Sequence, residues 1–144
     1  MIARLAPLTG ADLILIDTSV WIEVFRKPAP LRLESAVDFD DVVTCLPVIQ
    51  VVLQGFDDER AYLLAREAMH ALPIVESPLP RPIFDHAADL YRAARRAGLT
   101  VRSGVDCLIA ACAIRHGLEV LHRDRDYDLL TRVSPLRARR LKTR

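Results

Sequence analysis

Short apolar runs alternate with longer segments of helical periodicity along this chain. Residues 13–16 read Leu-Ile-Leu-Ile, four consecutive apolar residues, which is typical of a short strand buried on both faces of a parallel sheet. Further strands are expected at residues 42–45, 74–75 and 119–122. The pattern therefore predicts four strands, each separated from the next by helical sequence.

Capping and stop signals predict the helices between these strands. Thr18 and Ser19 offer side-chain oxygens to cap a helix that runs to residue 25 and ends before a pair of prolines. Ser103 and Asp106 stand three apart before an apolar run, which is the signature of a capping box, and Gly117 ends that helix. Further helices are expected at residues 31–37, 47–54, 57–69, 82–96 and 128–133, with a loop at 124–127.

Strands that alternate with helices indicate an α/β fold, with a mostly parallel sheet, right-handed crossovers and flanking helices. A chain of 144 residues fits one domain and is too short for two ordinary ones. We expect this domain at residues 13–136, between an N-terminal extension at 1–12 and a basic C-terminal tail at 137–144. The extension has neither the basic start nor the long apolar stretch of a secretory signal.

The composition argues against a membrane protein and favours a reducing compartment. No apolar stretch approaches the roughly 20 residues that a membrane span needs. The cysteines Cys45, Cys107 and Cys112 are odd in number and form no CxxC pattern. We therefore expect buried, reduced thiols and a cytoplasmic location.

Charge is unevenly distributed, although the net charge is only +1. Two segments are rich in basic residues: Arg92, Arg95, Arg96 and Arg102, and then Arg132, Arg137, Arg139, Arg140, Lys142 and Arg144. Segments of this kind contact phosphates in proteins that bind nucleic acid. They also occur as a solvated face and a frayed tail, and the sequence leaves both interpretations open.

Four acidic residues are expected near one edge of the sheet. Asp17 follows the first strand, Asp124 and Asp126 follow the strand at 119–122, and Asp106 lies in the first turn of an apolar helix. Ligands of open α/β sheets bind at the carboxyl ends of the strands, where these side chains would meet. Clustered carboxylates repel one another unless a cation compensates them, so the pattern indicates a divalent-metal site that hydrolyses phosphodiesters.

Each of these acids also has a purely structural explanation. Asp17 could cap the helix that follows it, and Asp106 could complete a capping box with Ser103. Asp124 and Asp126 could be loop acids that neighbouring arginines balance. Their joint placement in a fold that makes such loops converge favours the functional interpretation.

Three runs of the sequence resemble the motifs of PIN domains, and specifically of VapC-type ribonuclease toxins from bacterial toxin–antitoxin pairs: LILIDTSVWIEVFR, VRSGVDCLIAACAIRHG and VLHRDRDYDLL. The resemblance extends from about Leu13 to Leu136. It implies a PIN-like three-layer fold and a Mg²⁺- or Mn²⁺-dependent endoribonuclease that cuts structured RNA such as tRNA or rRNA. It also implies a cognate antitoxin as partner and a homodimer or dimer-based complex.

The resemblance implies which residues of this chain form the site, and all of them are aspartates or serines. The implied catalytic and metal-binding acids are Asp17, Asp106 and Asp124, and the implied auxiliary residues are Asp126, Ser19 and Ser103. The chemistry that the resemblance implies is hydrolysis by a water that the cation activates.

One position departs from the family pattern. Val51 stands in the segment at residues 47–55 where the family normally has a glutamate. Gln50 cannot replace that acid, because one helical step turns a side chain by about 100°. An isopropyl group neither binds a cation nor accepts a proton, so we expect an impaired nuclease. Val51 fits either a deliberate inactivating change or natural loss of the acid.

Three functions compete at this stage. The leading hypothesis is an RNA-cleaving toxin that is active in its parent form. The alternative is a binding module that keeps antitoxin or RNA binding without turnover. A phosphatase with Asp17 as its nucleophile is disfavoured, because Ser19 stands where a DxD motif would place a second acid.

Overall fold

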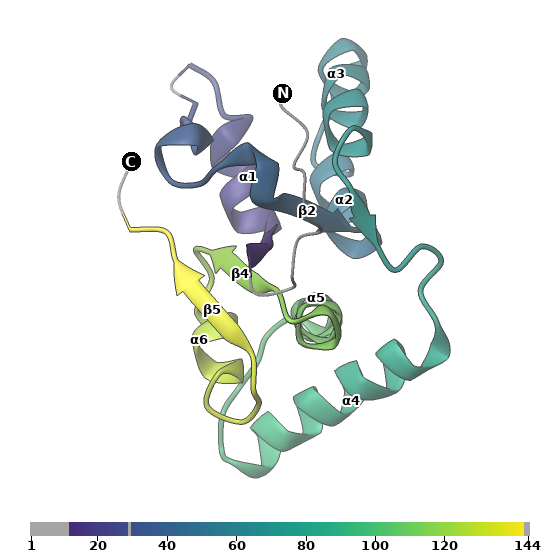
Figure 1. Ribbon diagram of the computed structural model, residues 1–144, viewed down its shortest axis with the longest axis vertical. Helices are drawn as coiled ribbons and strands as arrows, with labels where there is room; N and C mark the ends of the chain where they lie inside the picture. The colour runs from purple at the N-terminus through teal and green to yellow at the C-terminus, as the bar shows by residue number, and fades with distance from the viewer. Residues whose placement is uncertain (1–11, 29, 143–144) are drawn as a thin grey trace.

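The fold is a five-stranded sheet in which every neighbouring pair of strands is parallel, in the order β3-β2-β1-β4-β5. The computed structural model describes residues 12–28 and 30–142. Its strands are β1 (Ile14–Ile16), β2 (Val42–Cys45), β3 (Ile74–Val75), β4 (Glu119–His122) and β5 (Arg137–Arg140). The helices α1 (Thr18–Val24), α2 (Leu46–Leu53), α3 (Glu59–His70), α4 (Arg81–Arg96), α5 (Gly104–His116) and α6 (Arg125–Leu130) flank this sheet (Figure 1).

The core is built on the central strand β1 and on helix α5. Leu15 and Ile16 are fully buried, and burying each such side chain contributes about 1.5–3 kcal/mol. In α5 the small residues of the run Ala110–Ala113 are also fully buried, which lets this helix pack closely within the fold. Because α5 is held so firmly, the acid in its first turn, Asp106, has a fixed position.

The structure confirms the expected α/β class and its strands. Strands β2, β3 and β4 have the expected bounds, and β1 begins one residue later than expected. The helix expected at 31–37 is only a 3-10 turn at Leu33–Ser35. Asp17, and not Thr18 or Ser19, caps α1: its carboxylate accepts a hydrogen bond from the Ser19 backbone N–H.

Two local predictions around the site were wrong. Ser103 occupies the N-cap position of α5, but it makes no side-chain capping bond, so the expected capping box does not form. The Ser103 backbone N–H donates to Asp126 instead, and the Asp106 side chain lies near Tyr127. Helix α6 begins at Arg125, where a loop was expected, because Asp124 caps it by accepting from the Asp126 backbone N–H.

The expected basic tail is in part a strand of the sheet. Residues 137–140 form β5, which pairs with β4 along its whole length. The arginine side chains of β5 find partners within the protein: Arg137 donates to the Gly117 carbonyl, Arg139 pairs with Glu119 and Arg140 pairs with Asp128. The expected extension at residues 1–12 lies outside the described residues except for Asp12.

Two expectations from composition can be compared with the described residues. Cys45, Cys107 and Cys112 are free thiols and all three are buried, as expected. Within residues 12–28 and 30–142, no helix has both the length and the apolar character needed to cross a bilayer.

Candidate active site

Three of the expected site acids line a single pocket at the carboxyl ends of β1 and β4. Asp17 follows β1 directly, Asp124 follows β4, and Asp106 enters from the first turn of α5. The two strands are neighbours in the sheet, so parallel pairing brings their carboxyl ends together. This acid pocket has a volume of about 350 Å³, and its lining also includes Ser19, Ser103, Val51 and Gln54.

Asp17 is buried and held by three donors. One carboxylate oxygen, Oδ2, accepts from the Ser19 backbone N–H at 3.0 Å and from the Ser19 hydroxyl at 2.6 Å. The other oxygen, Oδ1, accepts from the Tyr127 hydroxyl at 2.6 Å. Charge-assisted bonds of this length stabilise a carboxylate and fix its orientation.

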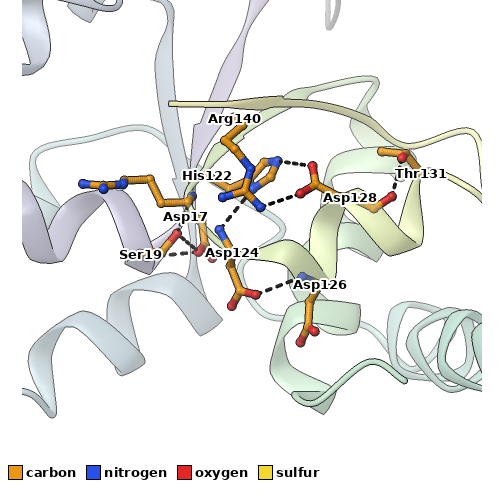
Figure 2. Close-up of polar contacts among 9 residues, drawn as sticks. Asp17, Ser19, His122, Asp124, Asp126, Asp128, Thr131 and Arg140 are labelled. Atoms are coloured by element: carbon orange, nitrogen blue, oxygen red, sulfur yellow. Dashed lines mark hydrogen bonds and ion pairs between the residues drawn. The ribbon is translucent and has the colours of Figure 1, made fainter. Parts of the chain in front are cut away.

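Ser19 joins the two strand-end loops of the site. While its hydroxyl donates to Asp17, the same oxygen accepts from the Arg123 backbone N–H at 2.9 Å. Arg123 directly precedes Asp124 in sequence. The contact therefore fixes the loop after β4 relative to the acid after β1. Figure 2 shows Ser19 bonded to Asp17.

Asp106 lies in the least favourable electrostatic environment of the three. The residue is 8% exposed, and among the described residues no donor reaches its Oδ2, which has only other carboxylates near it. Burial, followed by the neighbouring carboxylates of Asp126, Asp17 and Asp124, raises the pKa of Asp106 to about 9. Without a cation, this carboxyl group holds its proton at neutral pH.

Asp124 is positioned by a buried histidine. Its backbone N–H donates to Nδ1 of His122 at 3.2 Å, so the ring proton lies on Nε2, which faces Asp128 at 3.6 Å. Burial lowers the pKa of His122, which keeps the ring neutral and Nδ1 free to accept. Asp128 in turn pairs with Arg140 of β5 (Figure 2). Sequence patterns gave no sign of this role.

Asp126 lies beside the pocket and braces a loop. Both of its oxygens contact the Arg102 backbone N–H, at 3.1 and 3.2 Å, and Oδ2 also accepts from the Ser103 backbone N–H at 3.1 Å. These bonds anchor the segment that leads into α5. Asp126 therefore helps to place Asp106, which is the kind of support that an auxiliary acid provides.

The donor atoms fit a divalent cation of the Mg²⁺ or Mn²⁺ type. Oxygens of Asp106, Asp124 and Asp126 lie within 4.8 Å of one another, and carboxylate oxygens are the ligands such cations prefer. This cluster contains Asp126, whereas the pocket lining contains Asp17. Asp17 is the better candidate ligand, because it lines the open pocket through which a cation would enter, whereas Asp126 does not. Asp106 and Asp124 belong to both sets.

Val51 lines the acid pocket, which is where the glutamate of the family pattern would be expected. It is half-buried and lines the pocket beside Ile22, whereas Gln50 is exposed and is not part of the lining. Gln54, one helical turn after Val51, does line the pocket and brings an amide to it. No motif had pointed to Gln54.

An apolar groove adjoins the acid pocket. A hollow of about 240 Å³ shares Thr18, Ile22 and Val51 with the pocket. A second hollow of about 450 Å³ shares Phe25 and Phe56 with the first and extends to Leu64 and Ala65 of α3. The two hollows together form the apolar groove, which leads from the acids along α1, α2 and α3.

The sheet order, the acid pocket and the sequence together define the class of this protein. The PIN domain family matches residues 14–133, and the chain belongs to that family. Within the family it is 40% identical, over 133 residues, to ribonuclease VapC11 of Mycobacterium tuberculosis. That alignment covers 88% of this chain and 97% of the relative.

Solved structures of toxin–antitoxin proteins share the fold. The VapBC-5 structure from Mycobacterium tuberculosis superimposes with a TM-score of 0.67 and 22% identity, covering 90% of this chain and 99% of that chain. The DNA-bound VapBC structure from Salmonella typhimurium gives a TM-score of 0.71 at 17% identity, covering 89% of this chain and 97% of that chain. These matches confirm the PIN-like architecture expected from the three motifs.

Proposed function

We propose that this chain is a metal-dependent endoribonuclease, the toxin of a toxin–antitoxin pair, and that Val51 impairs its turnover. The observation that carries the proposal is the acid pocket, in which Asp17, Asp106 and Asp124 converge and Asp106 keeps a buried oxygen without a partner. The relationship to a protein named as a ribonuclease supports the choice of RNA as substrate.

In this proposal Asp17, Asp106 and Asp124 hold Mg²⁺ or Mn²⁺. When bound, such a cation stabilises charge on the phosphate and lowers the pKa of a water that it holds. Ser19 keeps the Asp17 carboxylate in one orientation, and His122 keeps the backbone of Asp124 in place. A cation would also stabilise the ionised form of Asp106, which burial and its neighbours now disfavour.

The substitution Val51→Glu tests both parts of this proposal. A glutamate at this position would bring a carboxylate into the acid pocket, which Val51 lines. Even changes to groups that only support metal ligands cost about 10- to 100-fold in affinity or activity. We therefore expect Val51→Glu to cleave a tRNA or rRNA substrate at least about 10- to 100-fold faster than the unaltered chain at the same Mg²⁺ concentration.

Val51→Gln is the matched control, since it adds a side chain of similar size without the acid. It should cleave no faster than the unaltered chain. Equal cleavage by all three proteins would contradict the assignment of an acid-dependent site to position 51.

The partner that best fits the surface is a cognate antitoxin. The solved structures that share this fold include one described as a member of the VapBC family of toxin–antitoxin systems. We propose that an arginine of the antitoxin enters the acid pocket, because its planar fork pairs with clustered carboxylates and excludes the cation. An apolar segment of the antitoxin would then lie in the apolar groove.

Two further properties complete the proposal. We expect a homodimer or a dimer-based toxin–antitoxin complex, which light scattering of the purified protein would test. A cytoplasmic location is supported by three buried free thiols, which suit a reducing compartment.

A binding module without turnover is the second candidate, and Val51 is the observation that favours it. Under this alternative, Val51→Glu would gain no cleavage while antitoxin binding persisted. A phosphatase with Asp17 as nucleophile is disfavoured, because three donors already engage the Asp17 carboxylate and would weaken its attack on phosphorus.

A further inference from the structure

Tyr127 places a hydroxyl group between two acids of the pocket. Its side chain comes from α6 and is fully buried. The hydroxyl donates to Oδ1 of Asp17 at 2.6 Å, and it lies 3.4 Å from Oδ1 of Asp106. One residue of a short helix therefore contacts both the acid that follows β1 and the acid in the first turn of α5.

The two contacts differ in strength, because a phenol has only one proton to donate. A bond of 2.6 Å to Asp17 has the length of a charge-assisted hydrogen bond, whereas 3.4 Å to Asp106 is near the outer limit. A phenol keeps its proton at neutral pH, since its ordinary pKa is about 10. Tyr127 is thus a permanent donor to Asp17.

The bond from Tyr127 nearly completes the set of donors around Asp17. An ionised carboxylate has about four acceptor positions. Ser19 fills two of them through its N–H and its hydroxyl, and Tyr127 fills a third. About one position is left for a cation, whereas Oδ2 of Asp106 has no partner among the described residues.

We propose that Tyr127 is a positioning residue of the acid pocket, whose hydroxyl locks the Asp17 carboxylate so that a single lone pair faces the cation shared with Asp106 and Asp124. The inference rests on the metal site proposed above. Tyr127 acts through Asp17 and not on the substrate. Without the hydroxyl, Oδ1 of Asp17 loses its donor and only the two Ser19 bonds to Oδ2 remain, so the approach of Oδ1 to the cation is less firmly fixed.

The ring of Tyr127 has a separate packing role, which makes the hydroxyl testable by itself. The ring lies against His122, with the two centroids 5.1 Å apart. Tyr127→Phe keeps this ring and removes only the hydroxyl. Tyr91→Phe is the matched control: Tyr91 lies on α4 beneath the Arg95 guanidinium and does not line the acid pocket.

The test is a calorimetric titration of the metal-free protein with Mn²⁺, together with thermal unfolding without metal. We expect Tyr127→Phe to bind Mn²⁺ about 10- to 100-fold more weakly than the unaltered chain, the usual loss for a residue that supports a metal ligand. Tyr91→Phe should leave the affinity unchanged. A purely structural role would lower the unfolding temperature of Tyr127→Phe and leave the Mn²⁺ affinity of the folded protein as it was.

The outcomes separate this inference from the proposed function. If the unaltered chain binds no Mn²⁺ at the pocket, the metal site and the role of Tyr127 both fail. If it binds and Tyr127→Phe binds equally well, only the role of Tyr127 is overturned.

A second measurement covers the case in which Tyr127→Phe does not fold. The chain has three tyrosines, so their ring Cζ signals can be followed by NMR in the unaltered protein labelled at that carbon. The Tyr127 signal should move during a Mg²⁺ titration with the midpoint of the binding curve, while those of Tyr62 and Tyr91 stay in place. A Tyr127 signal that does not respond to bound Mg²⁺ would overturn the inference.

Discussion

At the scale of single residues, the site acids are all aspartates and differ in how many hydrogen-bond donors surround their carboxylates. Asp17 and Asp126 each accept several hydrogen bonds from the protein, so the fold itself stabilises their placement. Asp106 lacks such support on one oxygen and has a strongly raised pKa. A cation supplies the charge that this residue lacks, which is why Asp106 is the most sensitive reporter of metal binding.

This environment predicts that metal binding releases a proton. With a pKa of about 9, Asp106 is protonated at pH 7 in the metal-free protein and must ionise to bind a cation. The affinity for Mn²⁺ should rise about tenfold per pH unit up to about pH 9 and then level off. Calorimetry in two buffers of different ionisation enthalpy should count about one proton released per cation at pH 7 and clearly fewer near pH 9. Binding at pH 7 without proton release would contradict the assignment.

The sequence predicted the three pocket acids because each stands at a recognisable boundary, a strand end or a helix start. It did not predict the roles of Tyr127 and His122. Apolar patterning treats a buried tyrosine as core, and nothing local reveals that its hydroxyl reaches residues 110 and 21 positions away in sequence. The tautomer of His122 likewise depends on a tertiary contact to the loop after β4.

At the scale of elements, the strands β1 to β4 were predictable and the edge strand β5 was not. Strands β1, β2 and β4 are largely buried and each contains consecutive apolar residues, whereas β5 reads Arg-Ala-Arg-Arg and is mostly exposed. Its place in the sheet comes from backbone pairing with β4 and from arginine partners that only the fold supplies. Basic sequence at the end of a chain therefore does not by itself indicate a tail.

The pairing of β5 with β4 predicts a stability loss on truncation. Ending the chain after Leu136 removes the strand, the Leu141 backbone bond to the His122 carbonyl, and the burial of Leu141. We expect the free energy of unfolding in urea to fall by on the order of 2–4 kcal/mol, from one buried leucine and lost hydrogen bonds. Ending the chain after Lys142 keeps all of these contacts and is the control. Equal unfolding midpoints for the two truncated chains would show that β5 adds no stability.

At the scale of the whole molecule, charge and apolar surface lie side by side. The acid pocket opens next to the apolar groove, and Ile22 and Val51 belong to both. A partner that brings a cationic side chain beside apolar ones can therefore occupy both at once. Val51, in place of the glutamate of the family pattern, keeps the groove apolar and leaves the other acids of the pocket in place. We therefore expect the chain with Val51 to bind its antitoxin.

Two adjacent leucines of α3 provide a matched test of the groove. Leu64 lines the apolar groove and is 61% exposed, whereas Leu63 is 50% exposed and is not part of the lining. Leu64→Asp should weaken binding of the co-expressed antitoxin by at least about tenfold, because a buried unpaired charge is costly at an interface. Leu63→Asp should bind as the unaltered chain does, measured by surface plasmon resonance. Unchanged binding by Leu64→Asp would place the antitoxin elsewhere, and equal losses for both variants would show that the effect is not specific to the groove.

The most direct test of the metal-dependent site is anomalous diffraction from crystals of the unaltered chain soaked with Mn²⁺, recorded at the manganese absorption edge. The account predicts an anomalous peak in the acid pocket, within bonding distance of Asp106 and Asp124 and facing one oxygen of Asp17. The site should form even though Val51 impairs turnover, because these three acids are intact. An empty pocket at saturating Mn²⁺, or a peak confined to surface acids far from Asp106, would contradict the account.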